Sequence, residues 1–172
     1  MATKHQKFEL SLKGYTEAER EAIAIEVIDQ IVKRTKSGKD KNGDAFAKYS
    51  KSYKDSQNFK IAGKGSSVDL TLSGDMLDSI QVLANRSAKV VIGFENGTTE
   101  NGKADGNIRG TYGQSSPVGP ARDFLGISES ELKRILSKYP KGTRESEIRA
   151  QKRLEIEKKA KEKTEDVETE EL

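Results

Sequence analysis

The sequence predicts an α+β fold in which a long N-terminal helix and a shorter C-terminal helix pack on a small, mostly antiparallel sheet. Two observations carry this prediction. Residues 16–36 place apolar side chains at helical spacing, and four short segments show the alternating or β-branched pattern of strands. Two long loop excursions, 35–67 and 95–119, and a charged C-terminal helical tail complete the predicted architecture.

The N-terminal helix is the largest apolar element of the chain. Thr16 is followed three residues later by Glu19, the pattern of a capping box that begins a helix. From there to about Lys36 the apolar residues fill a continuous arc of about 200° around the helix axis, with Ile23 and Ile31 among them. We therefore expect this helix to organise the core.

The strands are predicted from alternation and β-branched residues. Residues 7–12 alternate apolar and polar side chains, as does the segment 68–72. Residues 81–84 and 89–94 are predicted to be two strands joined by a turn at Asn85-Arg86-Ser87. These segments indicate a small sheet, and Gly74 is expected to let the chain turn from a strand into a short helix that contains Leu77.

The excursion 35–67 combines flexible residues with aromatic ones. It contains a turn at Asn42-Gly43, a short helix from about Ser50 to Asn58 and a flexible tip at 63–67. Four aromatic side chains would have nothing to bury against in a loop that is only flexible. We therefore expect them to dock the excursion onto the body or onto another subunit. These four residues are Phe46, Tyr49, Tyr53 and Phe59.

The C-terminal part begins with a second capping box, Ser128 with Glu131, and its helix is stopped at Pro140. A charged helix is predicted over 144–163, where the apolar positions fall on no single stripe. The last nine residues contain five acidic residues and no basic one, and are predicted to be disordered. The expected organisation is a domain over 1–140, a charged helical extension over 141–163 and an acidic disordered tail over 164–172.

Composition excludes several classes of site. The 172 residues include no cysteine and a single histidine, His5, so a thiolate nucleophile, a thiolate zinc site or a multi-histidine metal site is not expected. No apolar run is long enough for a membrane span, and no secretory signal is visible. We expect a soluble, non-catalytic protein of a reducing compartment, with no cofactor, no metal and no membrane partner.

Two motifs resemble binding loops but lack essential positions. The segment 40–44 places oxygen side chains like a calcium loop, but Ala45 stands where that loop needs glycine and Lys51 replaces its bidentate glutamate. The segment 63–66 is rich in glycine and lysine without the spacing of a phosphate-binding loop. We expect a plain turn and a loop tip, respectively.

A nucleic-acid interaction remains a second prediction. The net charge of the chain is only +3, yet basic residues of the segment 33–60 alternate with aromatic ones. Such a segment can contact a phosphate backbone through Lys51, Lys54 and Lys60. The acidic tail would then compete with the nucleic acid for these lysines. The alternative to a structural role is therefore a basic nucleic-acid-binding accessory protein.

Several motifs together resemble the phage virion morphogenesis (tail completion) family, in the family's order and spacing over residues 16–138. The first motif is matched by Leu70, Ser73, Gly74, Leu77, Ser79 and Ile80. An aromatic-glycine pair, Tyr112-Gly113, is followed by a third motif matched by Pro120, Ala121, Arg122, Phe124, Leu125 and Gly126. The chain differs from the family in having Phe46 where a tryptophan is expected, no histidine before Tyr112, and extra residues after Tyr139.

This resemblance implies a structural role in a virion. It implies a homo-oligomeric ring at the head-tail junction, assembled in the host cytoplasm, with phage connector or stopper proteins and tail terminator or tube proteins as partners. It also implies transient contact with DNA passing through the neck. Beside the four aromatic residues of the excursion, the interaction candidates are Tyr112 and Arg122, and Arg122 either bonds within its subunit or contacts a neighbour.

The same motifs contain the residues that we expect to be critical for the fold. Proline fixes φ at the entry to the last core segment, and the apolar residues after it bury against the long helix. These fold residues are Gly74, Leu77, Pro120, Phe124, Leu125 and Gly126.

Overall fold

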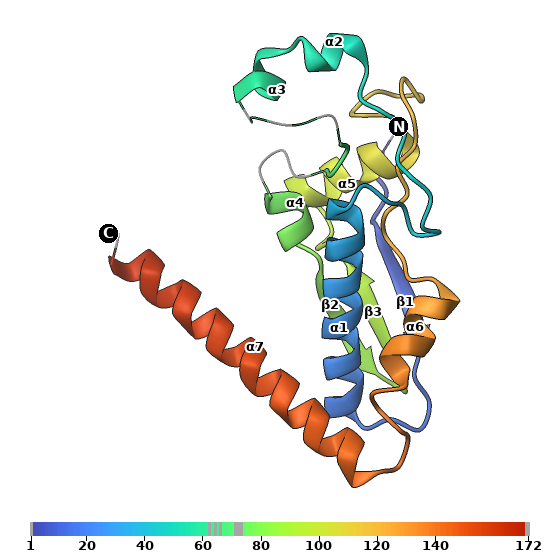
Figure 1. Ribbon diagram of the computed structural model, residues 1–172, viewed down its shortest axis with the longest axis vertical. Helices are drawn as coiled ribbons and strands as arrows, with labels where there is room; N and C mark the ends of the chain where they lie inside the picture. Colours follow the sequence, from blue (N-terminus) through green and yellow to red (C-terminus); the bar gives the residue numbers. More distant parts are fainter. Residues whose placement is uncertain (1, 62, 64, 66, 71–73, 171–172) are drawn as a thin grey trace.

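The computed structural model describes residues 2–61, 63, 65, 67–70 and 74–170, and it has the predicted α+β architecture (Figure 1). Its strands are β1 (Lys7–Ser11), β2 (Gln81–Arg86) and β3 (Lys89–Gly93). Its helices are α1 (Glu17–Lys36), α2 (Lys51–Lys54), α3 (Gln57–Ile61), α4 (Asp75–Asp78), α5 (Thr99–Arg109), α6 (Glu129–Leu136) and α7 (Arg144–Glu170).

The strands form one antiparallel sheet in the order β1-β3-β2. The turn of the β2–β3 hairpin is formed by Ser87 and Ala88, whose φ angles of 54° and 58° are both left-handed. Two consecutive left-handed residues match the right-handed twist of the strands that they join. The turn therefore lies later than predicted, because Asn85 and Arg86 still belong to β2.

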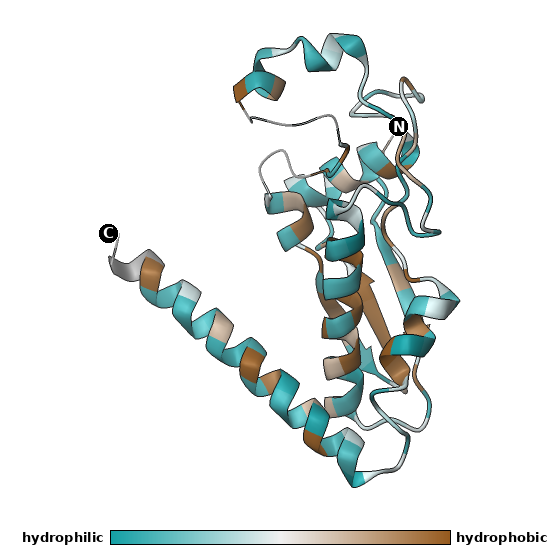
Figure 2. Cartoon of the chain, in the orientation of Figure 1, coloured by the Kyte–Doolittle hydropathy of each residue, from teal (hydrophilic) through white to brown (hydrophobic). Residues whose placement is uncertain are grey.

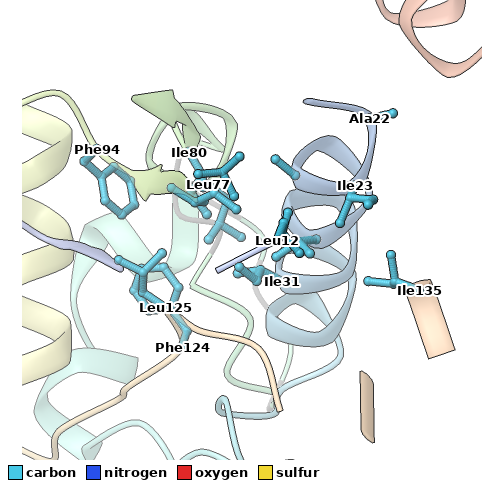
Figure 3. Close-up of a cluster of buried hydrophobic side chains, with 14 of the residues drawn as sticks. Leu12, Ala22, Ile23, Ile31, Leu77, Ile80, Phe94, Phe124, Leu125 and Ile135 are labelled. Carbon is cyan, nitrogen blue, oxygen red and sulfur yellow. The ribbon is translucent and has the colours of Figure 1, made fainter. Parts of the chain in front are cut away.

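Helix α1 packs against β2 and β3 and also against α6 and α7, so it stands at the centre of the core (Figures 1 and 3). The backbone N–H of Glu19 donates to Thr16 Oγ1 at 3.2 Å, and the N–H of Thr16 donates to Glu19 Oε2 at 2.8 Å, which completes the predicted capping box. Ile23, Val27 and Ile31 have no exposed surface. Burying one such side chain stabilises a fold by about 1.5–3 kcal/mol.

A buried arginine, Arg34, joins the C-terminal end of α1 to the segment that precedes α6. Its guanidinium donates to the carbonyl oxygens of Phe124 and Gly126 at 2.7 and 2.9 Å. It also donates to the carboxylate of Glu131 at 2.7 Å. Glu131 also completes the capping box of Ser128 at the start of α6. Arg34 therefore fixes both the segment 124–126 and α6 relative to α1.

The protonation of the Glu131 carboxylate makes the stability of the fold depend on pH in the acid range. Burial raises its pKa, but the hydrogen bonds from Ser128 and Gln30 and the charge of Arg34 outweigh burial and hold the pKa below its ordinary value of 4.5. A group with a depressed folded pKa stabilises the fold above its unfolded pKa, and that contribution is lost as pH falls through the folded pKa.

We therefore expect Glu131→Gln to lower the melting temperature near neutral pH and to match the wild type far more closely at about pH 3. Thermal unfolding of both proteins at the two pH values measures this difference. A gap between the two melting temperatures that is equally large at both pH values would contradict the prediction.

The structure corrects the prediction of a loop over 95–119, because most of its first half is helix α5. Thr98 caps the helix by accepting from the backbone N–H of Asn101 at 3.2 Å. The buried amide of Asn101 in turn donates to the carbonyl of Lys4 at 3.1 Å and accepts from the N–H of Gln6 at 2.8 Å. These long-range bonds hold turn-favouring residues in a helix.

Residues 68–70 do not form the beginning of a strand as predicted for 68–72. Val68 is buried, but Leu70 has a φ of 55°, a left-handed conformation that interrupts an extended chain. The rest of the predicted strand, residues 71 and 72, lies outside the described residues, as do residues 64 and 66 of the predicted loop tip.

The first half of α7 packs on α1, through small residues. Ser146 and Ala150 are fully buried and Leu154 is half-buried, and their spacing of four residues places them on one face of the helix. Two of these three residues are not large apolar ones, which is why the sequence showed no apolar stripe. An ion pair between Arg153 and Asp29 lies beside this contact.

The second half of α7 diverges from α1 and continues to Glu170, through most of the segment 164–172 that we predicted to be disordered (Figure 1). Glutamate and lysine are good helix formers, and a helix whose first half is already packed elongates at little cost. Figure 2 shows this half as mainly hydrophilic with separate hydrophobic bands. Ile156 and Val167 are each 59% exposed.

Candidate interaction site

A cavity of about 620 Å³ opens between α4, α5, the segment 110–122 and residues 47–61, which we name the arm. The arm contains α2 and α3 and projects from the body, at the end opposite the turn between α6 and α7 (Figure 1). The cavity is lined by Tyr49, Ser50, Tyr53, Leu70, Gly74, Met76, Lys103, Asn107, Tyr112, Val118, Gly119, Pro120 and Arg122. Four of our six interaction candidates are among these residues.

Arg122 fastens the arm to the body. Its side chain is only 6% exposed, and its Nη2 donates to the carbonyl of Ala47 at 3.2 Å while its Nη1 donates to the hydroxyl of Tyr112 at 2.5 Å. Its guanidinium carbon lies 5.4 Å from the ring centroid of Tyr49 and 5.9 Å from that of Tyr112. Within the described ranges no carboxylate pairs with it, so ring faces and oxygens stabilise its charge.

Tyr112 closes the loop that forms one wall of the cavity. Its hydroxyl accepts from Arg122 and donates to the carbonyl of Pro120 at 2.7 Å. Burial raises the pKa of this hydroxyl, although the charge of Arg122 opposes the rise. A Cβ at Gly119 would lie 2.8 Å from the Tyr112 ring, so only glycine lets the ring approach so closely.

The arm is folded by its own aromatic cluster. The ring centroids of Tyr49, Tyr53 and Phe59 lie 5.0, 5.6 and 5.4 Å apart, with tilted or edge-on geometry typical of favourable aromatic pairs. Phe46, the fourth aromatic residue of the excursion, is 8% exposed and belongs to the main core. The excursion is therefore docked by Phe46, by Arg122 and by Tyr49, which also packs against the core, whereas Tyr53 and Phe59 pack within the aromatic cluster.

The residues that we expected to be critical for the fold occupy different environments. Gly74 has a φ of 80° at the start of α4, a conformation that favours glycine. Gly126 is buried and gives its carbonyl to Arg34. Pro120 is exposed on the rim of the cavity. The other three are buried in the core: Leu77, Phe124 and Leu125.

Chemically, the site is an apolar and aromatic surface with two cations, Arg122 and Lys103. In the part of the chain that the structure describes, no three His, Cys, Asp or Glu side chains are grouped so as to hold a metal ion. No described helix has the length and apolar character needed to cross a membrane. A surface of this kind can bind apolar groups beside an anionic one.

Sequence reasoning missed the α5 side of the cavity, Lys103 and Asn107, because it predicted a loop there. A signal was present: Thr98 is a good N-cap, and Ala104 and Ile108 follow it at helical spacing. No pattern in the sequence around Val118 indicated that this residue would line the cavity.

Comparisons with known protein families, with curated proteins and with solved structures found no match to this chain. Its function is therefore inferred from the sequence and the geometry of the described residues.

Replacing Arg122 with leucine is expected to release the arm from the body. Because the variant loses the bonds to Ala47 and Tyr112, the amides of the arm should exchange with solvent about tenfold faster or more, with the amides of α1 little changed. Hydrogen–deuterium exchange resolved by segment measures this. The matched control is Lys103→Leu, because Lys103 lines the same cavity but pairs with Glu100 and not with the arm. Equal exchange of the arm in both variants would contradict the prediction.

Proposed function

We propose that this chain is a structural protein of a tailed bacteriophage, a tail-completion or neck component that forms an oligomeric ring at the head-tail junction and enables tail-to-head joining. It acts without catalysis, is assembled in the host cytoplasm, and meets a connector or stopper protein and a tail terminator or tube protein. The resemblance of residues 70–80 and 120–128 to the tail completion family supports this proposal.

The observation that carries the proposal is the exposure of apolar side chains on two projecting elements. Ile61 at the end of the arm is 81% exposed, and Ile156 in the middle of α7 and Val167 near its C-terminal end are each 59% exposed. Apolar groups on separate projections are covered when copies associate. Because the arm and α7 are different surfaces, association through them is heterologous, and a heterologous contact that closes produces a ring.

The segment 120–128 supports the same proposal, since it connects the arm to the core. Arg122 holds the arm, and two residues further on Phe124 has no exposed surface and packs edge-on against Phe94 at 6.2 Å. This short segment therefore joins the arm to the core. Such a connection suits a part that binds a neighbour.

Partner binding tests this function. Light scattering coupled to size-exclusion chromatography gives the mass of the chain alone and with purified neck proteins of a tailed phage. We expect a discrete complex with a connector or tail terminator protein and no complex with the major capsid protein. A chain that elutes unchanged with every neck protein would overturn the proposal.

A second function, binding of nucleic acid, is favoured by the lysines of the arm. Lys51, Lys54 and Lys60 have no ion-pair partner among the described residues. This function predicts DNA binding that weakens steeply with salt and is lost on Lys→Ala changes at these three positions. Its weakness is that the aromatic rings of the arm pack on one another and leave few faces for bases.

A further inference from the structure

A second cavity, of about 470 Å³, lies where α7 diverges from α1, and we name it the acidic groove (Figure 1). Part of its lining is apolar, including Ile25 and Ile28 of α1 and Val82 of β2, and we call this part the floor. The free half of α7 forms one wall through Glu157 and Lys161. The groove thus combines an apolar floor with a mostly exposed helix wall.

Carboxylates outnumber lysines in the lining of this groove, and three of them are ion-paired within the chain: Asp29 with Arg153, Glu100 with Lys103 and Glu157 with Lys161. The groove is lined by six carboxylates and one lysine: Glu21, Asp29, Asp78, Glu95, Glu100 and Glu157 against Lys161. Burial raises the pKa of Asp29, Arg153 opposes the rise, and the nearby carboxylate of Glu157 adds to it. Asp78 and Glu95 are exposed and, within the described residues, form no ion pair. A cation that enters the groove therefore relieves repulsion between like charges.

The arm has the complementary composition. It contains four lysines and one acidic residue: Lys48, Lys51, Lys54 and Lys60 against Asp55. None of these lysines is ion-paired among the described residues. The most exposed large apolar side chain of the described chain, Ile61, lies at the arm's end, next to Lys60. An apolar tip flanked by cations matches an apolar floor bordered by carboxylates.

We propose that the arm of one copy of this chain docks in the acidic groove of the next copy. Ile61 then covers the floor of the groove, and Lys54 and Lys60 pair with the carboxylates at its border, among them Asp78 and Glu95. This contact rests on the proposed ring and names the surfaces that form it.

A second copy is the occupant that both charge and topology favour. Each copy carries one arm and one groove, so the contact repeats identically around a heterologous ring. Opposite charges on the two surfaces steer the encounter and prevent arm-to-arm and groove-to-groove contacts. DNA fits less well, because the acidic groove repels a phosphate backbone.

Two charge-reversed variants of the full chain test the contact. The arm variant carries Lys54→Glu and Lys60→Glu. The groove variant carries Asp78→Lys, Glu95→Lys and Glu157→Lys, so that lysines outnumber carboxylates in its lining. In each variant alone the two surfaces have the same sign, so association should weaken about tenfold or more. In an equimolar mixture each arm meets a groove of opposite charge, so the mixture should assemble as the wild type does. Light scattering across concentration gives all four association curves.

The control reverses two exposed lysines outside both surfaces, Lys13→Glu and Lys152→Glu, and should leave assembly unchanged. Circular dichroism confirms that every variant is folded. A mixture that stays dissociated, or single variants that assemble like the wild type, would overturn arm-in-groove docking while leaving the ring intact. Loss of DNA binding in the arm variant without rescue in the mixture would favour nucleic acid as the partner. A wild-type chain that never associates overturns the ring and this contact together.

Discussion

Replacing Arg34 with alanine is expected to destabilise the fold by about 3–5 kcal/mol, the usual cost of removing one partner of a buried charged network. The variant leaves the buried carbonyls of Phe124 and Gly126 without their donor and removes the charge that pairs with the part-buried carboxylate of Glu131. A domain of this size is stable by only about 5–15 kcal/mol, so the melting temperature should fall by about 10 °C or more.

The matched control is Lys33→Ala, one residue earlier on the exposed side of α1. Its free energy of unfolding should change by no more than about 0.5 kcal/mol. Chemical denaturation of the three proteins compares them directly. An unfolding midpoint of Arg34→Ala equal to that of the control would show that Arg34 does not hold these elements together.

Replacing Phe124 with alanine should cost a similar amount, about 3–5 kcal/mol, because the truncation leaves a cavity in the core. Phe124 has no exposed surface and its ring meets that of Phe94 at an angle of 82°. The control is Phe59→Ala, which removes the same atoms from the aromatic cluster of the arm. Phe59 touches the arm and not the core, so this variant should keep a near-wild-type melting temperature and lose protection only in the arm. Equal destabilisation by both changes would contradict the separation of arm and core.

The elements predicted well from sequence are those encoded by local chemistry. Both capping boxes, Thr16 with Glu19 and Ser128 with Glu131, form as predicted because each is completed within four residues. The strands at 7–11 and 89–93 follow alternation and β-branched residues, which are also local signals.

The elements predicted poorly depend on contacts distant in the sequence. Helix α5 contains residues typical of turns, and it is held by bonds from Asn101 to Lys4 and Gln6, more than ninety residues away. Arg34 lies in a basic last helical turn that looks ordinary in the sequence, and it is buried only by its contacts with the segment 124–131. No local sequence pattern indicates contacts with residues so distant in the chain.

The geometry of the candidate site could not be predicted from the sequence. Tyr49, Tyr53, Tyr112 and Arg122 do line one cavity, yet the sequence did not indicate that Arg122 would lie against the rings of Tyr49 and Tyr112. The acidic groove was missed altogether, because its carboxylates come from α1, α4, α5, α7 and the segment between β3 and α5. Charges so scattered in sequence give no visible cluster.

The central claim, that this chain assembles into a closed ring, is tested most directly by native mass spectrometry of the wild-type chain over a range of concentrations. A heterologous contact that closes predicts one dominant oligomer of fixed mass that grows at the expense of the monomer. A monomer at every concentration, or an open-ended series of oligomers with no preferred size, would contradict the ring.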